Sequence, residues 1–404
     1  MAQPLKDRGF LRTANVEEAD IAIMNTCTVR DQAEHRAESN LGRLRPWKAA
    51  NPNRILIVAG CAASRWGDSI KKKFPFIDVV SPATRISQFP ETVAKVLEER
   101  WNFKTEEISD FGMRNSDFRN HLLEQNPNPK SDIRNPELLT DDWFGSDQTA
   151  YVTIMRGCNY SCSYCIVPQV RGREVYRPMP EILAEIERKT AEGYREVMLL
   201  GQTVNSYYWR QGEEMTVRGG GGDERKQQEL VYNSSIASVS PRLPVSPSAV
   251  LDFSDLLYAV QAIPTVERIR FMSPHPKHMK DRVIQAIAEC SKVARHLHLP
   301  LQSGSNEMLS KMKRLYTRDE YRTIIEKLRV AVPDLKITTD IIVGYPGEGE
   351  NDFQDSMNFM KEIAFNSVFA FKYSPRPGTA SAPLVDDVLE SVKDERLQQI
   401  LTFA

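Results

Sequence analysis

The chain has 404 residues, of which 41% are hydrophobic and 26% are charged, and this balance excludes disordered and fibrous proteins. Its 53 basic and 54 acidic side chains give a net charge of −1, so bulk electrostatics gives no argument for a nucleic-acid partner. The longest nearly apolar run, residues 55–63, is far short of the roughly 20 residues needed to cross a bilayer, so we expect a soluble two-domain protein with no membrane partner.

Residues 1–105 alternate short apolar segments with amphipathic ones. Strands are expected at 21–24, 55–58 and 77–80, and a helix is expected at 31–49. An alternation of strands and helices is typical of a parallel sheet. We therefore predict an N-terminal parallel α/β domain.

Two segments have the composition of connections. Residues 106–148 are polar and contain Asn-Pro-Asn-Pro at 126–129, which is typical of a linker. Residues 211–249 hold four consecutive glycines at 219–222 and a tail rich in serine and proline. We interpret this second segment as a disordered surface insertion, because doubling the length of a loop costs only about 0.6 kcal/mol.

Between residues 149 and 385 the chain repeats a strand followed by a helix six times. Six such units predict an open, partial (β/α)6 barrel related to the TIM barrel, and a doubly wound sheet is the alternative. In both architectures ligands bind at the C-terminal ends of the parallel strands. The expected strands are 151–156, 196–200, 266–272, 294–299, 335–343 and 367–373, and the expected helices include 181–192, 321–332 and 352–363.

The strongest chemical signal is a cysteine triad at the end of the first of these strands. Cys158, Cys162 and Cys165 are separated by three and then two residues, so three thiolates on one loop can bind three irons of a four-iron–four-sulfur (4Fe–4S) cluster and leave the fourth iron open. The open iron can chelate S-adenosylmethionine, whose carbon–sulfur bond the reduced cluster breaks to give a 5′-deoxyadenosyl radical. Structural zinc is the alternative. It requires a fourth ligand, and His121 is the only histidine or further cysteine within 40 residues of the triad.

The number and placement of the cysteines also indicate a compartment. There are six cysteines, and three of them lie within eight residues, which is not the pattern of a disulfide framework. Clustered thiols favour metal binding in a reducing compartment. We therefore expect a cytoplasmic protein, with an organelle matrix as the other possibility.

Several sequence blocks follow one another in a distinctive order. The first is Cys-Asn-Tyr-Ser-Cys-Ser-Tyr-Cys-Ile-Val-Pro at 158–168, followed by Arg-Gly-Arg-Glu at 171–174. Together with later blocks, it resembles the core of the radical S-adenosylmethionine methylthiotransferases. Ser-Pro-His-Pro at 273–276 is similar to the branch that acts on isopentenylated adenosine beside the tRNA anticodon, rather than to the ribosomal-protein or threonylcarbamoyladenosine branches. The other blocks lie at 200–207, 298–305, 340–348 and 371–379.

This resemblance implies a transferase that adds a methylthio group to carbon two of N6-isopentenyladenosine in tRNA. The cofactors it implies are S-adenosylmethionine and two 4Fe–4S clusters, one that generates the radical and one auxiliary cluster that presents the sulfur. The radical takes hydrogen from carbon two, and a second S-adenosylmethionine supplies the methyl group. The implied partners are the tRNA substrate and an electron donor such as flavodoxin or ferredoxin.

Glycines and polar residues of these blocks fall at the ends of predicted strands. Gly201 and Gly304 would let the backbone approach a ligand closely. Gln202, Gln302 and Asp340 offer polar groups suited to the amino-acid and ribose parts of S-adenosylmethionine. We expect these five residues to bind the cofactor.

Four histidines lie in or near the same blocks. The residues alone favour packing or surface roles for His275, His278 and His296. His298 stands at a strand end beside Gln302, and for this residue packing and ligand contact remain equally open.

The remaining cysteines are divided between the two domains. Cys27 and Cys61 each follow a predicted N-terminal strand, and taken alone they are either metal ligands or buried structural thiols. The resemblance implies that they hold the auxiliary cluster together with a third cysteine. Cys290 matches no block, and we expect it to be structural.

The chain departs from the family pattern at both ends and at three internal positions. The family's third auxiliary cysteine lies on a strand before the first helix, and this sequence begins within that helix, at residues 5–10. Residues 386–404 begin a C-terminal extension that in relatives continues into an RNA-binding β-barrel. Leu315, Tyr176 and Gly349 stand where relatives usually have Gly, Ser and Thr.

These departures leave three hypotheses. The first is an active tRNA methylthiotransferase whose sequence is incomplete at both ends. The second is a truncated radical enzyme that cleaves S-adenosylmethionine but cannot insert sulfur, because Cys27 and Cys61 alone do not hold a stable auxiliary cluster. The third is a non-catalytic remnant with a regulatory role.

Overall fold

A computed structural model of the chain describes residues 5, 8–11, 13, 15–28, 31–101, 149–210, 216–217 and 250–403. The expected linker at 106–148 and all but two residues of the expected insertion at 211–249 lie outside this part of the chain. The chain divides into two compact units, an N-terminal unit and a unit that holds most later elements. No helix in the described ranges is long and apolar enough to cross a membrane.

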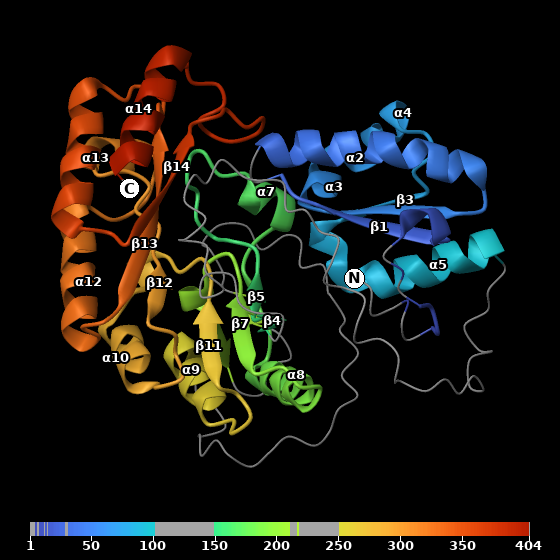
Figure 1. The fold of residues 1–404 in the computed structure, drawn as a ribbon, viewed down its shortest axis with the longest axis horizontal. Helices are drawn as coiled ribbons and strands as arrows, with labels where there is room; N and C mark the ends of the chain where they lie inside the picture. Colours follow the sequence, from blue (N-terminus) through green and yellow to red (C-terminus); the bar gives the residue numbers. More distant parts are fainter. Residues whose placement is uncertain are drawn as a thin grey trace. The chain divides into compact units, whose positions relative to one another are not determined.

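The N-terminal unit is built on a parallel three-stranded sheet. Its strands β1 (Ile21–Thr26), β2 (Ile55–Gly60) and β3 (Val79–Pro82) lie in the order β1-β2-β3, and both pairs are parallel. Helices α2 (Asp31–Ala50) and α5 (Phe89–Trp101) cover opposite faces of the sheet (Figure 1). The predicted parallel α/β domain is therefore confirmed, although its third strand begins at residue 79 rather than 77.

The central strand β2 holds the two faces together. All six of its residues are buried, as expected for a strand covered by helices on both sides. Leu56 packs against Leu41 and Trp47 of α2, whereas Ile57 belongs to the cluster around Val93 of α5. Two short helices follow this strand, α3 (Cys61–Trp66) and α4 (Ile70–Lys73).

Within the described ranges, the second unit contains six parallel strands whose spatial order follows the chain. They form two sheets of order β4-β7-β11 and β12-β13-β14. A parallel bridge between Ile269 and Val293 links β11 to the segment that leads into β12. A doubly wound sheet would reverse this order, so the arrangement is compatible with the predicted partial barrel. The strands are β4 (Thr149–Thr153), β7 (Glu196–Leu200), β11 (Arg268–Phe271), β12 (His296–His298), β13 (Lys336–Val343) and β14 (Ser367–Lys372).

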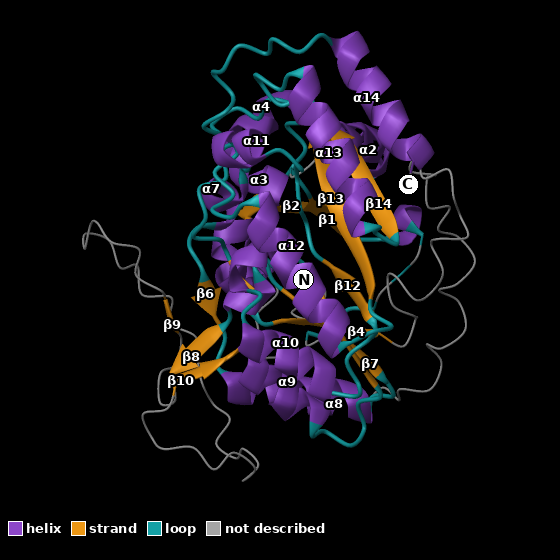
Figure 2. Cartoon of the chain, turned by 90° about the vertical axis from the view of Figure 1, so that its left-hand side faces the viewer, coloured by secondary structure: helices purple, strands orange, loops and turns teal. Residues whose placement is uncertain are grey.

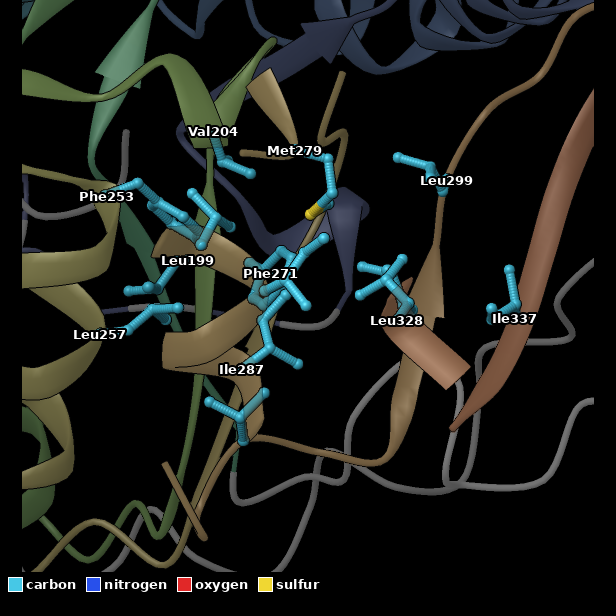
Figure 3. Packing of buried hydrophobic residues seen from close by; sticks show 14 of the residues in the cluster. Leu199, Val204, Phe253, Leu257, Phe271, Met279, Ile287, Leu299, Leu328 and Ile337 are labelled. Atoms are coloured by element: carbon cyan, nitrogen blue, oxygen red, sulfur yellow. The ribbon is translucent and has the colours of Figure 1, made fainter. Parts of the chain in front are cut away.

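Helices connect these strands and bury one face of them. In Figure 2, α12 and α13 lie together on one side of β12, β13 and β14. Figure 3 shows Leu199 of β7 facing Phe253 and Leu257 of α9, and each such buried side chain contributes about 1.5–3 kcal/mol. The helices are α7 (Val167–Arg171), α8 (Met179–Ala191), α9 (Phe253–Gln261), α10 (Asp281–Glu289), α11 (Asn306–Lys311), α12 (Arg318–Ala331), α13 (Glu350–Ile363) and α14 (Glu390–Phe403).

Strand β13 shows which residues face away from the helices. Ile337, Ile341 and Val343 belong to the hydrophobic core. Because successive side chains of a strand point to opposite faces, Thr338 and Asp340 lie on the other face. That face of the barrel strands is where polar site residues can be placed.

The insertion leaves the barrel from a two-stranded ribbon. Strand β8 (Tyr208–Arg210) pairs antiparallel with β10 (Val250–Asp252), and Arg210 is in register with Val250. The two ends of segment 211–249 therefore lie side by side, so its length does not disturb the barrel. A second antiparallel set joins β5 (Met155–Arg156), β6 (Val175–Tyr176) and β9 (Thr216–Val217).

Residues 386–404, expected to begin a C-terminal extension, contain α14. This helix packs against β13 and β14. Its Ile400 lies in the barrel core, and its buried Arg396 is 2.8 Å from the carboxylate of Glu348. In the structure α14 is thus part of the barrel unit.

Candidate active site

The loop that carries the cysteine triad begins with a backbone approach that only glycine permits. Gly157 follows β5 with a φ of +78°, and a Cβ at this position would lie 1.9 Å from the carbonyl oxygen of Arg173. The next residue, Cys158, donates its backbone N–H to the carbonyl of Gly172 at 3.1 Å. These contacts fix the direction in which Cys158 leaves the strand.

The three cysteines of the triad share one compact loop. Cys162 is buried, while Cys158 and Cys165 are partly exposed. The backbone N–H of Cys165 donates to the carbonyl of Cys162 at 3.0 Å, and Cys158 Sγ lies 3.5 Å from the hydroxyl of Thr203. Burial raises the pKa of Cys158, and burial raises the pKa of Cys165 to about 12. Without metal the thiols of Cys158 and Cys165 hold their protons at neutral pH, and metal binding would release them.

The arrangement of the sulfurs bears on the kind of metal site. Among the described residues, no group of three or more His, Cys, Asp or Glu side chains is gathered around a single-ion position. A 4Fe–4S cluster binds each thiolate to a different iron, so its ligands stand farther apart than those of one zinc ion. Three thiols on one loop are the donors that a 4Fe–4S cluster with one open iron uses, so the chemistry of the triad fits such a cluster.

Ser163 clamps the triad loop to the rest of the barrel unit. Its backbone N–H donates to Met312 at 3.1 Å, and its carbonyl accepts from the N–H of Ser381 at 2.8 Å. Its buried hydroxyl donates to the carbonyl of Lys311 at 2.9 Å and lies 2.8 Å from the hydroxyl of Tyr345. Ser163 carries no local sequence signal of this role, because all of these partners are at least 148 positions away along the chain.

Aromatic residues surround the same loop. The ring of Tyr160 stacks on His275 with centroids 4.1 Å apart, and its hydroxyl lies 2.7 Å from Nε2 of His278. Burial lowers the pKa of His275 to about 2, so this imidazole is neutral. The packing roles expected for His275 and His278 agree with these contacts. Both histidines contact Tyr160, which belongs to the triad loop.

The two glycines expected at the cofactor site make room for protein. A Cβ on Gly201 would lie 2.5 Å from the side chain of Met155, and a Cβ on Gly304 would lie 2.6 Å from Ser356 of α13. Internal packing thus explains the absence of a side chain at both positions. The close neighbours of Gly201 and Gly304 are protein atoms, so ligand contact at these two glycines stays a prediction.

Of the three polar residues expected at the cofactor site, Gln202 and Gln302 follow strands and Asp340 lies within β13. Gln202 follows β7, and its side-chain oxygen is buried without a hydrogen-bond partner among the described residues. Gln302 follows β12 with a φ of +74°, and its N–H donates to the carbonyl of Asp340 at 2.8 Å. A buried acceptor without a partner costs about 1–3 kcal/mol. The oxygen of Gln202 is therefore suited to the ammonium group of an amino acid such as that of S-adenosylmethionine.

His298, for which packing and ligand contact remained open, has partners on the neighbouring strand. Its Nε2 lies 3.2 Å from the carboxylate of Asp340, and its Nδ1 lies 3.1 Å from the hydroxyl of Thr338. These contacts orient Asp340. His298 therefore acts as a packing residue that holds the carboxylate of Asp340 in place.

In the N-terminal unit, Cys27 and Cys61 lie at the same edge of the sheet. Cys27 directly follows β1, and Cys61 directly follows β2. The preceding residues Thr26 and Gly60 are in register, and a Cβ on Gly60 would lie 2.4 Å from the carbonyl oxygen of Thr26. Cys27 is exposed and Cys61 is buried. The two thiols therefore stand on neighbouring strand ends, as expected of residues that share a ligand.

Cys290 has a different environment. It ends α10, is buried in the barrel core, and has its pKa raised to about 11 by burial. Its expected structural role agrees with this position.

Comparisons with known proteins match both units. A family model described as "Radical SAM superfamily" matches residues 152–360, and one described as "Uncharacterized protein family UPF0004" matches residues 1–82. The tRNA-2-methylthio-N(6)-dimethylallyladenosine synthase of Clostridium novyi (strain NT) is 41% identical over 400 residues, which cover 98% of this chain and 75% of that protein. The enzyme of the same name from Legionella pneumophila (strain Corby) is 38% identical over 96% of this chain and 74% of its own length.

A solved structure shares the fold at low sequence identity. It is the radical S-adenosylmethionine methyltransferase TsrM from Kitasatospora setae with tryptophan and a cofactor analogue bound, at a TM-score of 0.59 and 15% identity. The match covers 94% of this chain and 71% of that one. It supports the fold of the chain and leaves the chemistry to its own residues.

Proposed function

We propose that the chain adds a methylthio group to carbon two of N6-isopentenyladenosine next to the anticodon of tRNA. The chain belongs to the radical S-adenosylmethionine methylthiotransferases, in their tRNA 2-methylthio-N6-isopentenyladenosine synthase branch. It is a transferase that uses 4Fe–4S chemistry and S-adenosylmethionine. The observation that carries this function is 41% identity extending over 98% of the chain. That extent favours the active enzyme over the truncated-enzyme and remnant hypotheses.

Cys158, Cys162 and Cys165 are the proposed ligands of the radical-generating cluster. Bound there, this cluster would supply the electron that cleaves S-adenosylmethionine to the 5′-deoxyadenosyl radical. The chain contributes a loop held in place by the glycine approach at Gly157 and the clamp at Ser163. Of the three cysteines, Cys162 is buried, whereas Cys158 and Cys165 are partly exposed.

Gly201, Gln202, Gln302, Gly304 and Asp340 are the proposed S-adenosylmethionine site. The partnerless oxygen of Gln202 supports this role most directly, because it is an acceptor available to the cofactor's ammonium group. Asp340, oriented by a histidine, offers a carboxylate to the ribose hydroxyls. Gly201 and Gly304 contribute by letting neighbouring segments pack beneath the site.

Cys27 and Cys61 are the proposed ligands of the auxiliary cluster that presents the sulfur. Their adjacent strand ends support this assignment.

In the proposed domain organisation, residues 1–105 form the methylthiotransferase domain and residues 149–385 form the radical core. Residues 106–148 join the two domains, and the radical core carries the insertion 211–249. Residues 386–404 add α14 to the core. The electron donor is a flavodoxin or ferredoxin, and the enzyme acts in the cytoplasm or in an organelle matrix.

The test begins with iron and acid-labile sulfide per chain after anaerobic reconstitution. About eight irons are expected for two clusters. Product is then measured by mass spectrometry of nucleosides from an isopentenylated tRNA. Cys162→Ala should abolish 5′-deoxyadenosine, whereas Cys27→Ala should leave its formation intact and stop methylthiolation.

Cys290→Ala is the matched control, since it removes a buried thiol that lies in the core and should change neither iron content nor product. Persistent 5′-deoxyadenosine in Cys162→Ala would overturn the assignment of the triad. Undiminished product in Cys27→Ala would overturn the auxiliary role of that cysteine.

A further inference from the structure

Arg314 is a buried cation that touches the triad. Only 6% of the residue is exposed. Its Nη1 lies 3.4 Å from Sγ of Cys162 and 3.5 Å from the hydroxyl of Tyr164, and its Nε donates to the hydroxyl of Tyr316 at 3.0 Å. One guanidinium therefore donates to a proposed cluster ligand and is held by two tyrosines.

The guanidinium of Arg314 has no carboxylate partner among the described residues. Two other buried arginines of this unit do, because Arg270 lies 3.0 Å from the carboxylate of Glu196 and Arg396 lies 2.8 Å from that of Glu348. A buried charge without a counter-charge is costly. Its persistence points to an anion that completes the site when the protein is loaded.

The backbone around Arg314 is strained. Lys313 and Leu315, on either side, both have a φ of 56°. The left-handed conformation costs a residue with a side chain roughly 1–2 kcal/mol. Strain of this kind persists where the surroundings require one placement, and it gathers at functional sites. Here the two strained residues flank the inward-pointing Arg314.

A 4Fe–4S cluster on three thiolates supplies the missing anion. In its oxidised 2+ form the core and three thiolates carry a net charge of −1, and uptake of one electron makes this −2. A fixed cation at hydrogen-bond distance from one sulfur stabilises the more negative state more strongly. Hydrogen bonds to the sulfurs and the net charge near a cluster are among the factors that set its reduction potential.

We propose that Arg314 raises the reduction potential of the triad cluster by donating an N–H hydrogen bond to Sγ of Cys162. The step it controls is the transfer of one electron from a flavodoxin- or ferredoxin-class donor to the 2+ cluster, which gives the 1+ cluster without transfer of a proton. Arg314 is thus a positioning and tuning residue of the radical-generating site. The inference rests on the proposed role of the triad.

The test is a potentiometric titration of the full chain, followed by electron paramagnetic resonance and performed without S-adenosylmethionine. The triad cluster is identified beforehand as the one whose signal S-adenosylmethionine perturbs. Arg314→Gln should lower the reduction equilibrium constant at least tenfold, which is about 59 mV for a one-electron couple. Arg314→Lys keeps the positive charge but loses the planar guanidinium group, so its reduction potential should lie between those of the wild type and Arg314→Gln.

Arg322→Gln is the control for a change in net charge. Arg322 pairs with the carboxylates of Asp319 and Glu362, and its side-chain partners in the described ranges include no cysteine. Its replacement should leave the potential of the triad cluster unchanged. A wild-type potential in both Arg314 variants, at normal iron content, would overturn the inference while leaving the triad assignment intact.

A second measurement does not depend on Arg314→Gln and covers the case in which that variant fails to fold. In the reduced wild-type chain, an exchangeable proton of Arg314 should couple to the cluster, and its signal should vanish after transfer to D2O. Arg314→Lys, which keeps the charge, should alter that coupling. An identical exchangeable coupling in Arg314→Lys would also refute the hydrogen bond, whereas a triad that binds no iron would instead refute the proposed function.

Discussion

Gly157 and Gly172 form a pair of substitutions that separates backbone strain from steric blockage. Both have a positive φ, of 78° and 76°. They lie in two segments that are joined by the hydrogen bond from the N–H of Cys158 to the carbonyl of Gly172. A Cβ on Gly157 would lie 1.9 Å from the carbonyl oxygen of Arg173, whereas a Cβ on Gly172 would meet no heavy atom within 4 Å. Alanine therefore imposes backbone strain at both positions and a clash only at Gly157.

The magnitudes follow from these contacts. A side chain in a backbone region that glycine alone favours costs roughly 1–3 kcal/mol, and the reduced freedom of the unfolded chain returns about 0.4–1 kcal/mol. Gly172 has a φ of 76° and a ψ of −164°, so Gly172→Ala should lower the free energy of unfolding by about 1–2 kcal/mol. In Gly157→Ala the backbone must also move apart, which breaks the 3.1 Å hydrogen bond from Cys158 to Gly172, so we expect a loss of about 3 kcal/mol or more.

Denaturant unfolding followed by circular dichroism measures the two losses, and iron analysis measures their effect on the site. Gly172→Ala should bind iron as the wild type does. Gly157→Ala should lose about four irons per chain, because Cys158 is displaced. Equal stabilities of the two variants, or full iron in Gly157→Ala, would refute the steric reasoning.

Three further predictions concern single side chains. Ser163→Ala should lower the free energy of unfolding by about 2 kcal/mol, because its buried hydroxyl has two hydrogen-bond partners. Ser254→Ala removes a buried hydroxyl without a partner among the described residues, so it should be neutral or stabilising in the same denaturation assay. Burial lowers the pKa of His275 to about 2, from roughly 6.5 in the unfolded chain. The unfolded chain therefore binds a proton at a higher pH than the folded chain does. The stability present above pH 6.5 is consequently lost as the pH falls toward 2. Between pH 6.5 and 5 the wild type should lose about 2 kcal/mol more than His275→Gln, and parallel pH profiles of the two would contradict the burial of a neutral imidazole. Leu315→Gly should stabilise the chain by about 0.5–1 kcal/mol since Leu315 is 60% exposed with a φ of 56°, and Val330→Gly, at an exposed helical position, should destabilise it by about as much.

Much of the fold could be predicted because hydrophobic periodicity is a local signal. The strands expected at 196–200 and 335–343 match β7 and β13 to within one residue at each end. The helix expected from residue 321 begins at Arg318 instead, because Thr317 caps it and exchanges hydrogen bonds with Glu320. That Thr-x-x-Glu capping box is visible in the sequence, so its earlier start could have been predicted.

The strand expected at 77–80 shows a limit of the same signal. Ile77 is apolar and buried, but it lies in a turn in which its N–H donates to Phe74, and the strand begins only at Val79. A short apolar run does not distinguish a strand from a buried turn that leads into it. The burial of Ile77 was predictable, whereas its backbone conformation depended on how helix α4 ends.

The triad was evident from spacing alone, but the residues that position it were not. Arg314 contacts Cys162 across 152 positions, and Tyr345 contacts Ser163 across 182. Neither contact has a local sequence signal, because it depends on how separate βα units close around the barrel. Gly304 shows the same limit, since the glycine was visible in the sequence but the close packing of Ser356 of α13 against it was not.

Backbone strain connects these positions and explains why propensity could not find them. Four of the five non-glycine residues with a positive φ in the described ranges lie near strand ends of the barrel or around Arg314: Ser273, Gln302, Lys313 and Leu315. Each costs roughly 1–2 kcal/mol relative to ordinary backbone, so each is present against its own local preference. At Gln302 the compensation is visible, because its N–H and carbonyl both bond to β13. Tertiary contacts supply this compensation, so the strained residues gather where the barrel strands end and the triad is held, and a single sequence carries no local mark of them.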